Sequence, residues 1–330
     1  MERDEILGSR RSVLRTGALL AVSAATSISL AALGCVSSTQ SPPPRESSGT
    51  TYKHDTVPTE SIEAGGIRFA YRRFGAKKGV PLVFFQHFMG NLDDHDSALT
   101  DAFAADREVI LFNNAGVASS TGTTPDTIRQ TARDAEAFID ALGLETIDVL
   151  AHSMGGLVGQ QVAFDRPKLV RRLVLVGTGP RGGVGIGEMP PETQALFFKK
   201  YEHQEEMWLP ILFSPSASSQ AAGRAYLARI MARKDRDAGV SLETVKAQGA
   251  AIAAYGAEKD ETYAHLKDLH QPILVVNGNN DIIIPTINSY LLQQHAPNAQ
   301  LILYPDAGHG AHHQYPELFV QHTKLFLDAR

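Results

Sequence analysis

The segment that decides the fold reads Ile147-Asp148-Val149-Leu150-Ala151-His152-Ser153-Met154-Gly155-Gly156. It joins a mostly apolar run, typical of a strand buried on both faces, to a segment that we expect to be a helix. Ala151 and Gly155 stand two positions before and after Ser153. At a sharp strand-to-helix turn these two positions lie close to neighbouring backbone, so they must be small. The segment therefore predicts that the hydroxyl of Ser153 is lifted above the carboxyl edge of a sheet.

Outward from this segment, short apolar runs alternate with helical patterns. Strands are expected at 67–73, 82–85, 108–112, 147–151, 173–177, 273–276 and 301–304. Helices are expected at 124–142, 155–164 and 316–329, the first with an apolar stripe at helical spacing. This alternation predicts an α/β fold, with a mostly parallel sheet and helices on both of its faces.

The alternation stops between residues 180 and 268. Glycines and prolines lead into helical patterns at 192–212, 218–234 and 242–255, with no strand pattern among them. We interpret 180–268 as a helical cap inserted between two strands of a core formed by 60–179 and 269–330. Because its flanking strands bracket Ser153, the cap should lie over that residue. Its apolar side chains are candidates to line a pocket, namely Phe197, Phe198, Met207, Trp208, Leu212 and Phe213.

Two later loops supply an acid and a base. Asp281 follows the expected strand 273–276, and His309 follows the last expected strand. Both residues directly follow the carboxyl ends of strands. This is the edge of the sheet at which open α/β folds have their active or binding sites. A serine hydroxyl needs a base to become a nucleophile, and the base needs an orienting acid. Asp306 is a competing acid, but it lies too near His309 in sequence to reach the far ring nitrogen comfortably.

The motifs Ala-His-Ser-Met-Gly-Gly, Gly-Asn-Asn-Asp and Ala-Gly-His occur in the order serine, aspartate, histidine. From about residue 60 onward the chain resembles α/β-hydrolases of the cofactor-free haloperoxidase and esterase branch. The resemblance implies a serine hydrolase that cleaves a small carboxylic ester or lactone through an acyl-enzyme, with Ser153, Asp281 and His309 as the triad. Perhydrolysis by peroxide and carbon–carbon hydrolysis are alternatives on the same triad. A ligand-binding protein on the hydrolase fold is an alternative of another class.

An oxyanion hole requires two N–H donors. The residue after the nucleophile, Met154, should give one of them. The loop after strand 82–85 should give the other, through Phe88, or through Met89 if the register slips by one. Relatives of this branch usually have His-Gly-x in that loop, whereas here Gln86 and His87 precede Phe88.

Metal binding is a weaker interpretation of two further clusters. His309, His312 and His313 have a His-x-x-His spacing but no carboxylate beside them in sequence. The run Asp93-Asp94-His95-Asp96 is explained by helix capping and the helix dipole. We therefore expect neither a metal nor another cofactor.

The first 36 residues resemble an export signal. Arg10 and Arg11 precede a weakly apolar run at 16–36, the order of a twin-arginine signal. Cys35 ends this run in a context that resembles a lipoprotein processing box, while Ser29-Leu30-Ala31 offers an ordinary cleavage site instead. Residues 37–59, rich in Ser and Pro to residue 51, are expected to be a flexible linker. These features predict export from a bacterial cytoplasm to the periplasm or cell surface, with membrane contact only through a lipid on Cys35.

The amino-acid composition limits the kinds of molecule that this protein is expected to bind. The chain of 330 residues carries 31 Lys and Arg against 36 Asp and Glu, for a net charge of −5, and has no basic stripe. Nucleic-acid binding draws on clustered cations, so a nucleic-acid partner is not expected. With 43% hydrophobic residues, the chain can bury a large core around a small-molecule site. Oligomeric state does not follow from these features.

Overall fold

The computed structural model describes residues 53–329. The export signal, the lipidation candidate Cys35 and most of the expected linker lie outside the described residues. Within 53–329 no helix is both long and apolar enough to cross a membrane.

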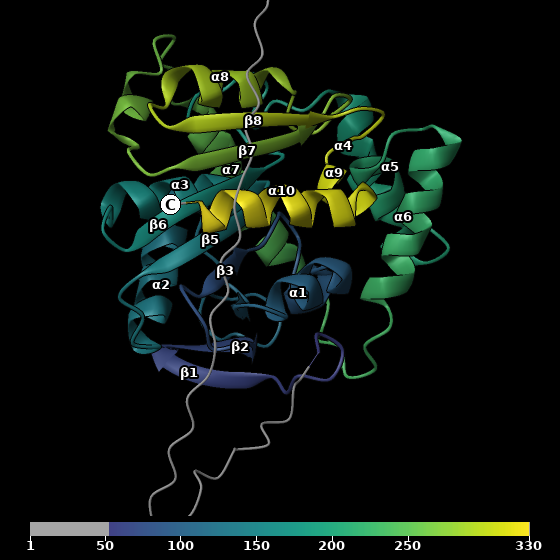
Figure 1. Cartoon of the computed structure of the whole chain (residues 1–330). Coiled ribbons are helices and arrows are strands. Elements are labelled where there is room, and N and C mark those ends of the chain that lie inside the picture. Colours follow the sequence, from purple (N-terminus) through teal and green to yellow (C-terminus); the bar gives the residue numbers. More distant parts are fainter. Residues whose placement is uncertain (1–52, 330) are drawn as a thin grey trace, which may run out of the picture. The chain divides into compact units, whose positions relative to one another are not determined.

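One sheet of eight strands organises the described chain (Figure 1). Its order is β1-β2-β4-β3-β5-β6-β7-β8, with antiparallel pairing of β1 with β2 and of β2 with β4, and parallel pairing elsewhere. The strands are β1 (Glu60–Ala64), β2 (Ile67–Gly75), β3 (Leu82–Phe85), β4 (Glu108–Phe112), β5 (Ile147–His152), β6 (Val170–Val176), β7 (Ile273–Gly278) and β8 (Ala299–Tyr304). The predicted α/β-hydrolase architecture is confirmed.

Helices cover both faces of this sheet. Two of them, α1 (Ser97–Ala104) and α10 (Pro316–Asp328), pack on one face, and α2 (Ile128–Ala141) and α3 (Met154–Asp165) on the other (Figure 1). Successive side chains of β3 alternate between the two cores, since Val83 packs with α2 and α3 whereas Phe84 packs with α1 and α10. A strand whose two faces are both covered must be apolar throughout, and this explains the uninterrupted apolar runs.

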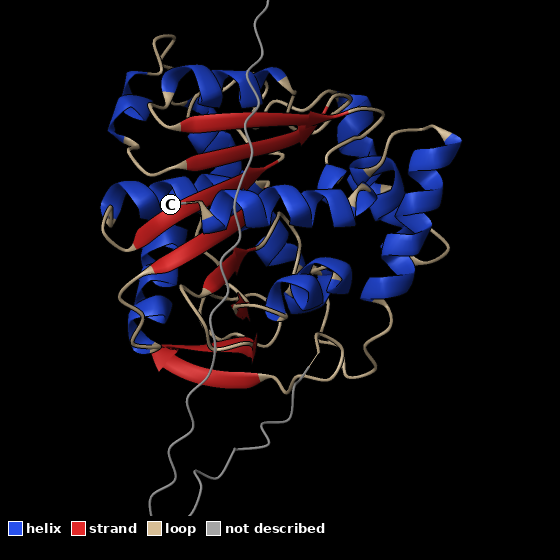
Figure 2. Cartoon of the chain, viewed as in Figure 1, coloured by secondary structure: helices blue, strands red, loops and turns tan. Residues whose placement is uncertain are grey.

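The segment between β6 and β7 is helical, as expected. It contains α4 (Pro191–Phe198), α5 (Trp208–Leu212), α6 (Ala217–Ile230) and α7 (Leu242–Ala257), with 3₁₀ helices at Gln204–Met207 and Ala264–Asp268. The single helix expected at 192–212 is broken. Pro210 has no N–H and fits only the first turn of a helix, so a new helix begins at Trp208. The arrowheads of β7 and β8 point toward α4, α5 and α6, which places the cap beside the carboxyl edge of the sheet (Figure 2).

The cap is held to the core by polar contacts. Both carboxylate oxygens of Asp96, the N-cap residue of α1, accept hydrogen bonds from Arg229 of α6, at 2.6 and 2.7 Å. The hydroxyl of Tyr226 donates to the backbone oxygen of Asp94 at 3.0 Å. Asp94 also closes a capping box with Asn91, so helix capping explains Asp94 and Asp96, as predicted. Asp93 has another role, because its buried carboxylate pairs with Arg72 at 2.8 Å.

The last part of the expected flexible linker 37–59 is packed instead. The side chains of His54 and Val57 are buried, and the N–H of His54 donates to Asp101 at 2.7 Å. Arg233 of the cap region donates to the backbone oxygens of both His54 and Val57. Because these contacts are far apart in sequence, the Ser- and Pro-rich composition of the preceding segment did not reveal them.

Candidate active site

Ser153 occupies the turn between β5 and α3. Its backbone angles, φ 55° and ψ −121°, are unusual for a residue with a side chain. Close packing holds the turn, since a Cβ at Gly155 would lie 2.3 Å from the backbone oxygen of Phe85. A Cβ at Gly156 would lie 2.5 Å from Thr178. The small residues that the sequence places after Ser153 are therefore required by neighbouring strand ends.

The structure brings His309 and Asp281 together. The Nδ1 atom of His309 lies 2.8 Å from Oδ2 of Asp281, and both side chains are buried. The other oxygen of Asp281 accepts hydrogen bonds from the backbone N–H groups of Ile283 and Ile284, at 2.8 and 3.0 Å. These bonds fix the carboxylate on a loop that would otherwise be free to move, and they leave Oδ2 to orient the imidazole.

Asp306, the competing acid, is used elsewhere. Its carboxylate accepts hydrogen bonds from the hydroxyls of Ser216 and Ser218, at 2.6 and 2.8 Å. Asp306 thus ties the start of α6 to the loop after β8, and Asp281 is the carboxylate that contacts the His309 ring.

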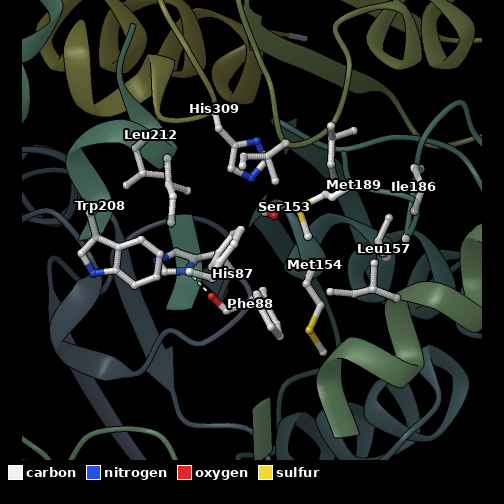
Figure 3. Close-up of a pocket in the computed structure, with 16 residues that line it drawn as sticks. His87, Phe88, Ser153, Met154, Leu157, Ile186, Met189, Trp208, Leu212 and His309 are labelled. Atoms are coloured by element: carbon white, nitrogen blue, oxygen red, sulfur yellow. Dashed lines mark hydrogen bonds between the residues drawn. The ribbon is translucent and has the colours of Figure 1, made fainter. Parts of the chain in front are cut away.

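The loop after β3 lies against Ser153. His87, Phe88, Ser153, Met154 and His309 all line one pocket (Figure 3). Among the described residues no hydrogen bond uses the N–H of Phe88 or of Met154, so both donors remain available. The N–H of Met89, the alternative donor, is taken by the side chain of Gln248 at 2.9 Å.

Gln248, on α7 of the cap, was missed by the sequence analysis. Its oxygen holds the turn at 87–90, in which Met89 adopts a left-handed φ of 64° and Gly90 N–H bonds to the His87 oxygen. The two residues in this contact are 159 positions apart, so no local pattern signals it.

His87 takes the place of the glycine that is usual in this loop. Its Nδ1 lies 2.9 Å from the Phe88 oxygen, the contact dashed in Figure 3, so Nδ1 carries the hydrogen. Its ring packs edge-on against Trp208 of the cap, with ring centres 4.7 Å apart. Burial lowers the pKa of His87 to about 3, which keeps the ring neutral. His87 therefore stiffens the loop and narrows the pocket without adding charge.

The pocket has an apolar lining. The core contributes Phe88, Met154, Leu157, Ile283 and Ile284, and the cap segment contributes Ile186, Met189, Phe197, Trp208, Ile211, Leu212 and Ile252. Of the cap side chains expected here, Phe197, Trp208 and Leu212 line the pocket, while Phe198 is 73% exposed. Such a pocket suits an apolar group next to the polar atoms of Ser153 and His309.

Residues 80–316 match the model of the alpha/beta hydrolase fold family. The chain belongs to this family. A solved structure of an alpha/beta hydrolase fold protein from Chitinophaga pinensis is 40% identical to this chain, with a TM-score of 0.79, and the match covers 84% of this chain and 100% of that one. Est816, described as an N-acyl homoserine lactone degrading enzyme, is 27% identical with a TM-score of 0.62, over 81% of this chain and 100% of its own.

Curated relatives include hydrolases of several substrate classes. They also include the dihydrolipoyllysine-residue acetyltransferase component of the acetoin cleaving system of Cupriavidus necator, which is 29% identical over 75% of this chain and 63% of its own length. The pimeloyl-[acyl-carrier protein] methyl ester esterase of Nitrosomonas europaea is 30% identical over 52% of this chain and 68% of its own length. A 2-hydroxy-6-oxononadienedioate hydrolase from a Pseudomonas species is 26% identical over 59% of this chain and 68% of its own. The chain spans 63% to 68% of the length of these three curated relatives.

Proposed function

We propose that this hydrolase cleaves a small carboxylic ester or lactone through an acyl-enzyme formed on Ser153. One observation carries the proposal, namely the buried contact between His309 and Asp281 in a pocket that Ser153 shares with His309. In this mechanism His309 removes the hydroxyl proton of Ser153 as the oxygen attacks the carbonyl carbon. The same proton then passes to the leaving alcohol, and water releases the acyl group by the reverse steps.

Two backbone donors and one carboxylate complete the proposed machinery. The N–H groups of Phe88 and Met154 would stabilise the negative oxygen of the tetrahedral intermediate. Asp281 would hold the Nδ1 hydrogen of His309 and stabilise the ring when it becomes positively charged. No metal or organic cofactor enters these steps.

The apolar lining and the relatives support this substrate class. Twelve apolar side chains from core and cap face the pocket, which suits a hydrocarbon acyl or alcohol group. The similar proteins include one named for a methyl ester and one described as degrading an N-acyl lactone.

A panel of nitrophenyl esters and γ-lactones of rising chain length tests this proposal. Hydrolysis should be measured for the wild type and for Ser153→Ala, with and without hydrogen peroxide. We expect ester or lactone turnover with a preferred chain length, and a loss of about 10⁴–10⁶-fold in kcat in the variant. Peroxide-dependent turnover alone would favour a perhydrolase. The absence of turnover in a folded wild type would favour a ligand-binding protein.

We further propose that the hydrolase is exported and anchored by a lipid on Cys35. The support is the sequence alone, with paired arginines, an apolar run and the small-residue context of the cysteine.

A further inference from the structure

Three histidines meet behind the Ser153 turn. His152 is the last residue of β5, and His312 and His313 belong to α9 (Ala311–Gln314), the short helix that follows His309. One ring nitrogen of each lies within 4.8 Å of those of the other two. Sequence spacing grouped His312 and His313 with His309, whereas the fold brings His152 of a distant strand to these two.

We propose that His152, His312 and His313 bind one divalent transition-metal ion of the zinc class. Three imidazoles with an open fourth position are a common ligand set for Zn²⁺. The three proposed ligands are distinct from the triad residues, although the ring of His152 lies 4.9 Å from that of His309. The proposal does not depend on the proposed hydrolase function.

Burial favours this assignment. The three residues are only 2% to 4% exposed, so the proposed ligands are largely shielded from bulk water.

The cluster also has ring nitrogen atoms without a well-aligned hydrogen bond. Among the described residues, Nδ1 of His312 and both ring nitrogens of His313 are buried without a well-aligned hydrogen bond. The Nε2 atom of His152 lies 3.1 Å from the backbone oxygen of His309, so it carries the hydrogen and leaves a lone pair on Nδ1. A buried polar atom without a partner destabilises a protein, and a bound ion would relieve this cost.

A carboxylate stands where it can support the ligands. Oδ2 of Asp96 lies 3.4 Å from Nδ1 of His313, and the Asp96 side chain is fully buried. Carboxylates that contact metal-bound histidines orient the ring and offset the charge of the ion. A small cavity lined in part by Gln86, Asp94 and His95 adjoins the cluster.

An ion at this position would link two parts of the proposed active site. His152 precedes Ser153, and α9 follows the loop that carries His309. The proposed role is therefore structural, because the ion would fix the nucleophile turn against the histidine loop.

The test is metal binding by the purified full-length hydrolase after removal of metals with a chelator. Zn²⁺ alone should bind at one ion per chain and raise the unfolding temperature, and X-ray absorption at the zinc edge should show three imidazole ligands. His312→Gln and His313→Gln should each weaken binding by more than about 100-fold, since even outer-shell changes cost 10–100-fold. His322→Gln is the matched control, because its ring bonds to Tyr304 outside the cluster.

Three results would overturn the proposal. They are no stoichiometric binding by the folded wild type, binding that is unchanged in the His312→Gln/His313→Gln double variant, or a ligand shell without three imidazoles. The first and third do not require the variants to fold. Binding should persist in Ser153→Ala, so failure of the proposed catalytic function would leave this result unaffected.

Discussion

At the scale of single residues, Asp281 shows how one side chain fixes the state of another. Its two oxygens have different partners, since Oδ1 accepts two backbone N–H groups and Oδ2 faces Nδ1 of His309. A carboxylate can accept hydrogen bonds at both of its oxygens, whereas an amide of the same shape can accept at only one. The His309 tautomer with a hydrogen on Nδ1 and a lone pair on Nε2, which a general base requires, follows from this arrangement.

Asp281→Asn should therefore reverse that tautomer. The amide oxygen would face Ile283 and Ile284, so the amide NH₂ would face His309 and force the lone pair onto Nδ1. We expect kcat for a reactive ester to fall by about 10³–10⁴-fold with an unchanged fold.

Asp306→Asn is the control for this experiment. Asp306 holds Ser216 and Ser218 of the cap and does not contact His309, so its amide variant should keep near-wild-type kcat. Comparable losses in the two variants would contradict the assignment of Asp281.

Gln248 gives a second prediction at this scale. Gln248→Met removes the acceptor for Met89 N–H and loosens the turn that presents Phe88. Since a lost oxyanion donor costs about 10²–10³-fold, we expect a misplaced donor to lower kcat by up to about 10²-fold, with a smaller effect on KM. Steady-state kinetics separates the two constants, and a change confined to KM would argue against Phe88 as a donor.

These residues also show what local sequence can reveal. Ser153, Asp281 and His309 follow apolar strands, and parallel strands carry such residues to one edge of the sheet. The contacts of Gln248, and the meeting of His152 with His312 and His313, join distant segments. No spacing rule along the chain encodes them, so the fold itself was needed to find them.

At the scale of elements, the close approach of α3 to the end of β3 constrains the proposed site. Gly155→Ala would place a Cβ 2.3 Å from the Phe85 oxygen, and neither backbone can yield easily. We expect a loss of about 1–3 kcal/mol in the free energy of unfolding and a further loss of activity as the Ser153 turn shifts.

Gly249→Ala is the matched control for Gly155→Ala. Gly249 lies within α7, and a Cβ there would meet nothing within 4 Å. The free energy of unfolding of this variant should rise by about 0.5–1 kcal/mol, because alanine restricts the conformations of the unfolded chain. Urea unfolding measures both variants, and equal stabilities would contradict the packing described at Gly155.

Apolar strands and striped helices were recovered well from sequence, whereas exposed elements were not. The edge strand β1 is mostly exposed and has no alternating apolar pattern. The helix α8 (Ile287–His295) was also not expected, and only three of its residues are buried. An element that contributes little to a core leaves a weak hydrophobic pattern, so periodicity cannot detect it.

At the scale of the whole molecule, buried neutral histidines make stability depend on pH. Burial lowers the pKa of His54 from 6.5 to about 4 and that of His87 to about 3, and that of His95 is also well below its usual value. Arg72 and Arg233 lower the His54 value further, while Asp93 and Asp96 raise it. The unfolded chain takes up these protons at a higher pH than the folded chain does.

Stability should therefore be full above pH 6.5 and fall as the pH drops toward about 4, with His54 contributing up to about 3 kcal/mol. Asp94 acts in the opposite direction because burial raises its pKa to about 6. Burial also raises the pKa of Asp101, Asp134, Glu136 and Asp148, but by less, so the large shifts of His54, His87 and His95 dominate. Urea unfolding of metal-free protein at several pH values measures this slope. His54→Gln should flatten part of it, and stability that rises on acidification would contradict the prediction.

The proposed lipid anchor is tested in a bacterial host that processes such signals. Cys35→Ala should move the hydrolase from the membrane fraction to the released fraction, because the acyl chains would have no attachment point. Fractionation followed by immunoblotting measures this shift. An unchanged distribution would exclude the lipid on Cys35.

The central claim is that Ser153 is an activated nucleophile in this pocket. The most direct measurement is intact-mass and peptide mass spectrometry after exposure to a fluorophosphonate, which reacts with activated serines. The proposed mechanism predicts one adduct per chain, on the peptide that contains Ser153, and none in a folded Ser153→Ala variant. An unlabelled but folded wild type, or an adduct on another residue, would contradict the claim.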